Sequence, residues 1–150
     1  MLDRQLFVRL KTAKRLRRIN AEIFNDFYRE HFFAYYNKDG SLTTEKTKTP
    51  VPLYQQAVSW MDKLGYNIMV IPDYYNDGII WEYQIYWYSD INKVPEENYN
   101  ISSGTYRINS NDCLMRNNAI DAAINRCLDE YEKYGKRKVV YNTKLKFKLI

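Results

Sequence analysis

The ten residues from Ile79 to Tyr88, with the sequence IIWEYQIYWY, constrain the fold more than any other segment of the chain. Successive side chains of a strand point to opposite faces of the sheet. One face of this run is entirely apolar or aromatic and consists of Ile79, Trp81, Tyr83, Ile85 and Trp87. The other face is more polar and consists of Ile80, Glu82, Gln84, Tyr86 and Tyr88. The pattern predicts a strand in the middle of a sheet, with one face in the core.

Each face of this strand leads to an expectation. Burial of the tryptophan face would make Trp81→Ala one of the most damaging substitutions, with a loss of about 3–5 kcal/mol in the free energy of unfolding. On the other face, Tyr86 and Tyr88 are candidates for a recognition surface, because tyrosine offers a flat apolar area with a polar tip. The chain holds 15 tyrosines, which fits either a core with wet edges or such a surface.

Periodicity predicts further helices and strands on both sides of this run. Helices are expected from Leu2 to about Tyr28, with a break near Asn20, and over 50–64 and 112–134. The short aromatic run from Phe32 to Gly40 suggests a small strand that ends in a turn. Further strands are expected over 66–74, 79–88, 105–109 and 139–150. Glycines 40, 65, 78 and 135 lie where turns or helix ends are predicted.

Together these elements predict an α+β fold with a mostly antiparallel sheet and two helices packed on one face. The expected order is helix, three strands, helix, preceded by a basic amphipathic N-terminal helix and followed by a C-terminal strand. A chain of 150 residues should form one compact domain. Within it, we expect an N-terminal helix and short aromatic strand over 1–40, an exposed linker over 41–49, and an α+β body over 50–150.

Charge is distributed unevenly along the chain, whose formal net charge is +5. Basic residues gather at the two ends, while the middle is acidic, so the ends either close on the acidic body or bind a polyanion. Lys144, Lys146 and Lys148 have a simpler interpretation, because lysines on an edge strand block unwanted pairing. The candidate polyanion-binding residues are Arg4, Lys11, Lys14, Arg15, Arg18, Lys136, Arg137 and Lys138.

The sequence gives no pattern that predicts catalysis, a cofactor or a metal. The single histidine, His31, lies among aromatic residues and is typical of a packed or half-exposed ring. Cys113 and Cys127 are expected in one helix about 21 Å apart, too far for a disulfide, so both thiols should be free. With one histidine they cannot form a zinc site. We therefore expect no enzyme and no catalytic, cofactor-binding or metal-binding residue.

The chain also lacks the patterns of membrane insertion and secretion. No run approaches 18 consecutive apolar residues, and the N-terminus has no signal-peptide block. These observations predict a cytoplasmic protein without a membrane span.

Four segments together resemble a family of small uncharacterised phage and prophage proteins of gut anaerobes. They are LKTAKRLRRINAEIF (Leu10 to Phe24), YYNKDGSL, the Pro50 helix with Ala57 and Trp60, and NAIDAAINRCLDEY (Asn118 to Tyr131). The resemblance implies a phage-encoded accessory, host-interaction or virion protein, located in the bacterial host cytoplasm or in a virion, and it names no site residue. The first hypothesis is thus a non-catalytic interaction protein with an unknown protein partner. The alternative is a nucleic-acid or nucleotide-binding protein that uses the basic termini and an aromatic sheet surface.

Overall fold

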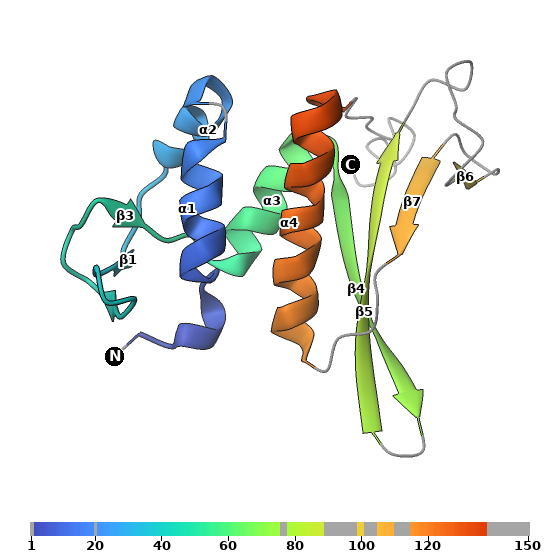
Figure 1. Ribbon diagram of the computed structural model, residues 1–150, viewed down its shortest axis with the longest axis horizontal. Coiled ribbons are helices and arrows are strands. Elements are labelled where there is room, and N and C mark those ends of the chain that lie inside the picture. The colour runs from blue at the N-terminus through green and yellow to red at the C-terminus, as the bar shows by residue number, and fades with distance from the viewer. Residues whose placement is uncertain are drawn as a thin grey trace, which may run out of the picture.

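The computed structural model describes residues 2–19, 21–75, 78–88, 99–100, 105–109 and 115–137. Within these ranges the chain forms four α-helices, one short 3₁₀ helix and two antiparallel sheets, which confirms the predicted α+β class. Figure 1 shows the N-terminal helices and the small sheet on one side of the molecule, the larger sheet on the other, and helices α3 and α4 between them. None of the helices in the described part is long and apolar enough to cross a membrane.

The N-terminal segment forms helices that are shorter than the predicted one. A 3₁₀ turn, η1, is followed by two α-helices that flank the expected break near Asn20, a residue that lies outside the described ranges. Helix α1 ends at Arg18, and the next residue, Ile19, is extended with ψ of 120°. The bounds are η1 (Arg4–Leu6), α1 (Leu10–Arg18) and α2 (Ala21–Tyr28).

A small three-stranded sheet follows α2, with the strand order β2-β1-β3. Its strands are β1 (Tyr35–Tyr36), β2 (Leu42–Thr43) and β3 (Thr49–Pro50). The predicted turn is present, since Gly40 has a φ of +86°. The predicted linker over 41–49 is only partly correct: it is mostly exposed, but it supplies β2 and the first residue of β3. The backbone of Tyr35 and Tyr36 in β1 pairs with β2 on one side and with β3 on the other. The composition of the segment does not reveal this pairing.

The larger sheet confirms the predicted hairpin and the predicted short third strand. Strands β4 (Asn67–Tyr75) and β5 (Gly78–Tyr88) pair antiparallel, from Asn67 opposite Tyr86 to Tyr75 opposite Gly78. Strand β7 (Thr105–Asn109) pairs with β5, and β6 (Tyr99–Asn100), which was not predicted, pairs with β7. The expected strand over 139–150, with its three lysines, lies outside the described residues.

Helices α3 (Tyr54–Lys63) and α4 (Arg116–Tyr134) lie on the same side of this sheet (Figure 1). Helix α3 begins later than predicted, after both prolines rather than around them. Helix α4 begins after Met115, whose φ of −127° and ψ of 143° are extended. Cys113 therefore precedes the helix and lies outside the described residues, so the expectation that one helix holds both cysteines is wrong. Cys127 is a free, buried thiol, and burial raises its pKa.

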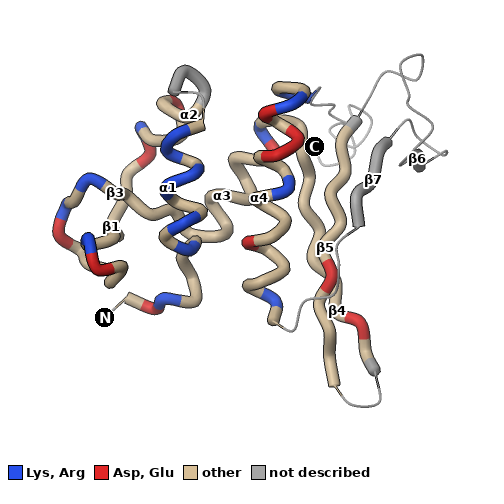
Figure 2. The backbone as a smooth tube through the Cα atoms, viewed as in Figure 1, with Lys and Arg blue, Asp and Glu red and all other residues tan. Residues whose placement is uncertain are grey.

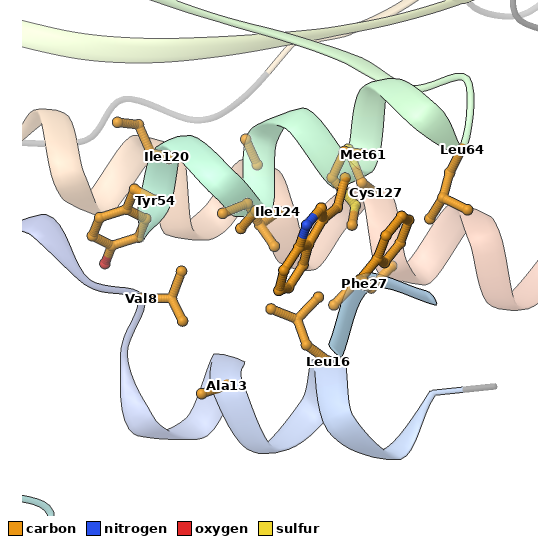
Figure 3. Packing of buried hydrophobic residues seen from close by; sticks show 14 of the residues in the cluster. Val8, Ala13, Leu16, Phe27, Tyr54, Met61, Leu64, Ile120, Ile124 and Cys127 are labelled. Atoms are coloured by element: carbon orange, nitrogen blue, oxygen red, sulfur yellow. The ribbon is translucent and has the colours of Figure 1, made fainter. Parts of the chain in front are cut away.

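One hydrophobic cluster joins the N-terminal helices to α3 and α4. It includes Val8, Leu16, Phe27, Met61 and Ile124, which converge in Figure 3. Trp60 is 1% exposed and stacks on Phe27 with ring centroids 5.1 Å apart and planes 2° apart. The main core thus lies between the helices rather than on the sheet alone.

The predicted core face of β5 is buried along only half of its length. Ile85 and Trp87 are buried beneath the helices, while Trp81 is half-buried and Ile79 is 44% exposed. The hairpin extends past the end of α4 (Figure 1), and Tyr74, opposite Ile79, is 77% exposed. The expectation that Trp81 is a core residue is therefore wrong, because alternation assigns a side chain to a face and does not say how far the covering helices reach.

Gly65 is required where α3 turns into β4. Its φ is +88°, and a Cβ at this position would lie 2.5 Å from the carbonyl oxygen of Arg137. The backbone N–H of Arg137 donates to Leu64 O at 2.8 Å, which holds Arg137 against this turn. Gly135 also has a positive φ, +70°, but nothing lies within 4 Å of its would-be Cβ.

We expect Gly65→Ala to lower the free energy of unfolding by about 2–3 kcal/mol, of which left-handed strain accounts for about 1–2 kcal/mol. Gly135→Ala, which adds strain without a clash, should cost about 1 kcal/mol. Urea denaturation of both variants measures the difference. Equal losses would show that Arg137 does not pack on this turn.

Candidate anion-binding cleft

The predicted polyanion-binding residues fall into exposed and engaged groups. Lys11, Lys14 and Arg18 are exposed on α1, and Figure 2 shows basic residues along this helix. Arg4 in η1 and Lys136 after α4 are exposed at other places, and Lys138 lies outside the described residues. Four of the eight candidates thus lie on α1, and three of them are exposed there.

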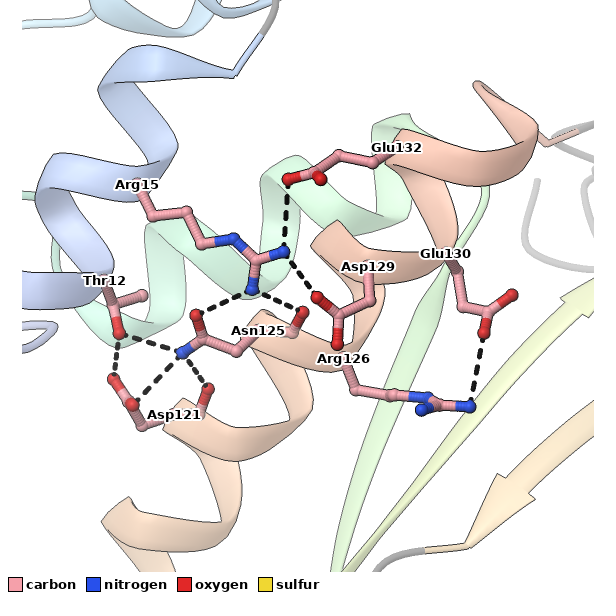
Figure 4. A network of polar contacts seen from close by, with 8 residues as sticks. All are labelled: Thr12, Arg15, Asp121, Asn125, Arg126, Asp129, Glu130 and Glu132. Atoms are coloured by element: carbon pink, nitrogen blue, oxygen red, sulfur yellow. Dashed lines mark hydrogen bonds and ion pairs between the residues drawn. The ribbon is translucent and has the colours of Figure 1, made fainter.

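Arg15 is engaged by α4 and is not a free cation. Its guanidinium donates to the backbone oxygen and to Oδ1 of Asn125 at 3.0 and 3.1 Å. It also forms ion pairs with Asp129 at 2.5 Å and Glu132 at 3.2 Å (Figure 4). Part of the basic N-terminal end thus closes on acidic residues of the chain, which was one of the two alternatives expected from the sequence.

Arg137 is also used within the fold. Its guanidinium carbon lies 5.3 Å from the centre of the Trp87 ring and 4.5 Å from that of Tyr134. Its Nε is buried without a hydrogen-bond partner among the described residues. Arg137 therefore packs on aromatic rings at the end of α4, and its role in polyanion binding stays a prediction.

The structure describes no exposed surface formed by the two candidate recognition residues, Tyr86 and Tyr88. Tyr86 is half-buried, and its hydroxyl is hydrogen-bonded to Oε1 of Gln84 on the same strand. Tyr88 ends β5 opposite Thr105. Because the side chain of Tyr88 lies outside the described residues, the role of this pair in recognition stays a prediction. A second surface, with aromatic rings and accessible polar groups, lies within the described residues.

Such a surface lines a cleft of about 400 Å³ beside α1, between the chain that follows α2 and the loop that connects β2 to β3. Its lining brings basic and aromatic side chains together from three separate stretches of the chain. The lining residues are Arg17, Tyr28, Arg29, Glu30, His31, Phe32, Tyr35, Lys46, Thr47, Lys48 and Pro50.

Four of these lining residues are basic, and all four are exposed: Arg17, Arg29, Lys46 and Lys48. Arg29 has a surface ion pair with Asp26 at 3.5 Å, which contributes little because both partners are solvated. The other three form no ion pair within the part of the chain that the structure describes. The cleft therefore presents cations that have no internal anion to neutralise them.

Glu30 is the single acidic lining residue, and both of its oxygens are already engaged by α3. Oε1 accepts a hydrogen bond from Trp60 Nε1 at 3.1 Å, and Oε2 accepts one from Gln56 Nε2 at 3.1 Å. Lys63 Nζ lies 3.5 Å from Oε1. These contacts turn the carboxylate toward α3 and fix the chain after α2, and Lys63 offsets part of its charge.

The wall of the cleft is aromatic. Tyr28 and Phe32 stack with centroids 5.3 Å apart, and the guanidinium carbon of Arg17 lies 4.7 Å above the Tyr28 ring. Tyr35 Oη donates to Phe32 O at 3.3 Å. Burial raises the pKa of Tyr28 to about 12, so its phenol stays neutral at neutral pH and adds no negative charge. The cleft therefore places aromatic side chains next to exposed positive charge.

The loop that carries Lys46 and Lys48 is held against β1. Thr47 Oγ1 donates to Tyr36 O at 2.8 Å and accepts from the backbone N–H of Thr49 at 3.2 Å. The two lysines flank this fixed residue, and both line the cleft. In the sequence this stretch was interpreted as a linker, so its lysines were not candidates.

Arg17, Arg29 and His31 were also missed as cleft residues. His31 is exposed and lines the cleft, whereas a packed or half-exposed ring was expected. The available signal was a basic and aromatic run, Tyr28 to Phe33, followed by Lys46-Thr47-Lys48 in a polar segment. Only tertiary structure joins these segments to Arg17.

The described residues contain no group of histidine, cysteine and carboxylate side chains that could hold a metal ion. The predicted phage origin stays a prediction. Comparison of the chain with protein-family models, with curated proteins and with solved structures gives no significant match.

Proposed function

We propose that this protein is a non-catalytic binding protein that takes a nucleotide or a nucleic-acid strand into the cleft. One observation supports this function above the others: four basic side chains surround an aromatic wall, and the only acidic lining residue has both oxygens bound by α3. Of the two functions expected from the sequence, the cleft favours nucleic-acid or nucleotide binding, although it uses a different aromatic surface from the one predicted.

The chemistry of the cleft matches the two parts of a nucleotide. Lysine and arginine bind phosphate oxygens, and aromatic rings stack on bases without regard to sequence. A volume of about 400 Å³ lies within the usual range of small-ligand sites, about 300–1,000 Å³. Arg17 lies over the Tyr28 ring and lines the cleft, where its guanidinium can bind a phosphate attached to a nucleoside that stacks elsewhere on the wall.

The test is the double variant Lys46→Gln/Lys48→Gln, measured with adenosine 5′-monophosphate and with a labelled ten-nucleotide single strand at low salt. We expect the dissociation constants to rise about tenfold, because phosphate contacts are lost. Stability should change by less than about 0.5 kcal/mol for each substitution, since both lysines are exposed. The matched control, Lys38→Gln/Lys133→Gln, changes the net charge equally at exposed positions outside the cleft.

An equal loss of affinity in both double variants would mean that binding follows net charge alone and not the cleft. Failure of the wild-type protein to bind either probe at low salt would rule out this function. A protein partner, the first hypothesis from the sequence, would then be the function to test, by pull-down from a host lysate with and without nuclease.

A further inference from the structure

Helix α1 carries a row of basic side chains that the cleft does not use. The row consists of Lys11, Lys14 and Arg18, is named here the α1 ridge, and is exposed. At 100° per residue, the ridge lies between Arg17, which lines the cleft, and Arg15, which binds α4. The ridge therefore begins at the rim of the cleft and is bounded on its other side by the acidic residues of α4.

The ridge places three cations in a row along one helix, where successive phosphates of a strand can contact them. A helix rises 1.5 Å per residue, so Lys11 and Lys14 are separated by about 4.5 Å along the axis and Lys14 and Arg18 by about 6 Å. No member of the ridge forms an ion pair within the described residues, so binding an anion breaks no internal contact. Asp129 and Glu132, already paired with Arg15, would repel a polyanion beyond the ridge and keep it on this path.

We propose that the ligand is a single strand of nucleic acid several nucleotides long, with one base in the cleft and its neighbouring phosphates along the α1 ridge. This inference rests on the proposed function and deepens it. A duplex would fit less well, because a paired base reaches the aromatic wall only after it leaves its stack. A mononucleotide would use the cleft and leave the ridge empty.

The test compares adenosine 5′-monophosphate, a ten-nucleotide single strand and the same strand in a duplex. We expect the single strand to bind at least about tenfold more tightly than either of the other probes. The triple variant Lys11→Gln/Lys14→Gln/Arg18→Gln should lose that advantage while its affinity for the mononucleotide changes by less than about twofold. For the single strand, its salt slope should fall by about 2, since each lost contact removes about 0.7.

The matched control for the ridge is Lys38→Gln/Arg116→Gln/Lys133→Gln, which removes three exposed charges that belong neither to α1 nor to the lining of the cleft. It should leave the preference for the single strand intact. Tight mononucleotide binding together with no effect of the ridge variant would overturn this inference and leave the proposed function standing. A duplex that binds as tightly as the single strand would also overturn it. If the wild-type protein bound none of the three probes, the proposed function itself would be refuted.

Discussion

Trp60→Ala is expected to lower the free energy of unfolding by about 3–5 kcal/mol, the usual cost of emptying a buried tryptophan site. Its indole is 1% exposed and contacts the rings of Phe27, Tyr28 and Phe32. Its Nε1 also donates to Glu30, so the substitution leaves a cavity and removes a hydrogen bond at once. Urea denaturation followed by circular dichroism measures the loss.

Trp81→Ala is the matched control, because it removes the same side chain from a half-buried position on β5. We expect a loss of about 1–2 kcal/mol, in proportion to the smaller apolar area that this side chain withdraws from water. If the two substitutions cost the same, the helices would have to cover the hairpin much further than the structure shows.

Asn125→Leu is the second substitution with a large expected effect, about 2–4 kcal/mol. Asn125 Nδ2 donates to Thr12 Oγ1 at 3.0 Å and to the backbone oxygen of Asp121 at 2.9 Å, while its Oδ1 accepts from Arg15. The buried carboxylate of Asp121 would keep only the hydrogen bond from Thr12, at 2.8 Å (Figure 4). The bond that the carboxylate loses is the one from Asn125 Nδ2 to Asp121 Oδ2, at 3.3 Å. Because a buried carboxylate with fewer hydrogen bonds is costly, α1 should separate more easily from α4.

Asp129→Ala tests the exposed part of the same network. Its carboxylate pairs with Arg15 at 2.5 Å but is solvated, and Glu132 remains as a partner. We therefore expect a loss below about 1 kcal/mol. Thermal denaturation of the two variants side by side measures the contrast, and an Asn125→Leu variant as stable as the wild type would show that the network does not dock α1.

Local sequence patterns predicted much of the fold. Alternation over Ile79 to Tyr88 predicted β5, and the glycines at positions 40, 65 and 135 marked ends that do have positive φ. These features follow from backbone sterics and from the periods of helix and strand, which act within a few residues. The third strand at Thr105–Asn109 was predicted on the same basis.

Tertiary structure alone decided what individual side chains do. Arg15 and Arg17 are chemically identical and two positions apart, but about 200° of helix rotation points one at α4 and the other at the cleft. Trp60 and Trp81 both lie on predicted apolar faces, yet only Trp60 is covered by the chain after α2. Burial and charge pairing depend on elements far apart in sequence, and no local period encodes them. The sequence by itself therefore determined where helices, strands and turns lie, and only packing decided which tryptophan is core and which cations are free.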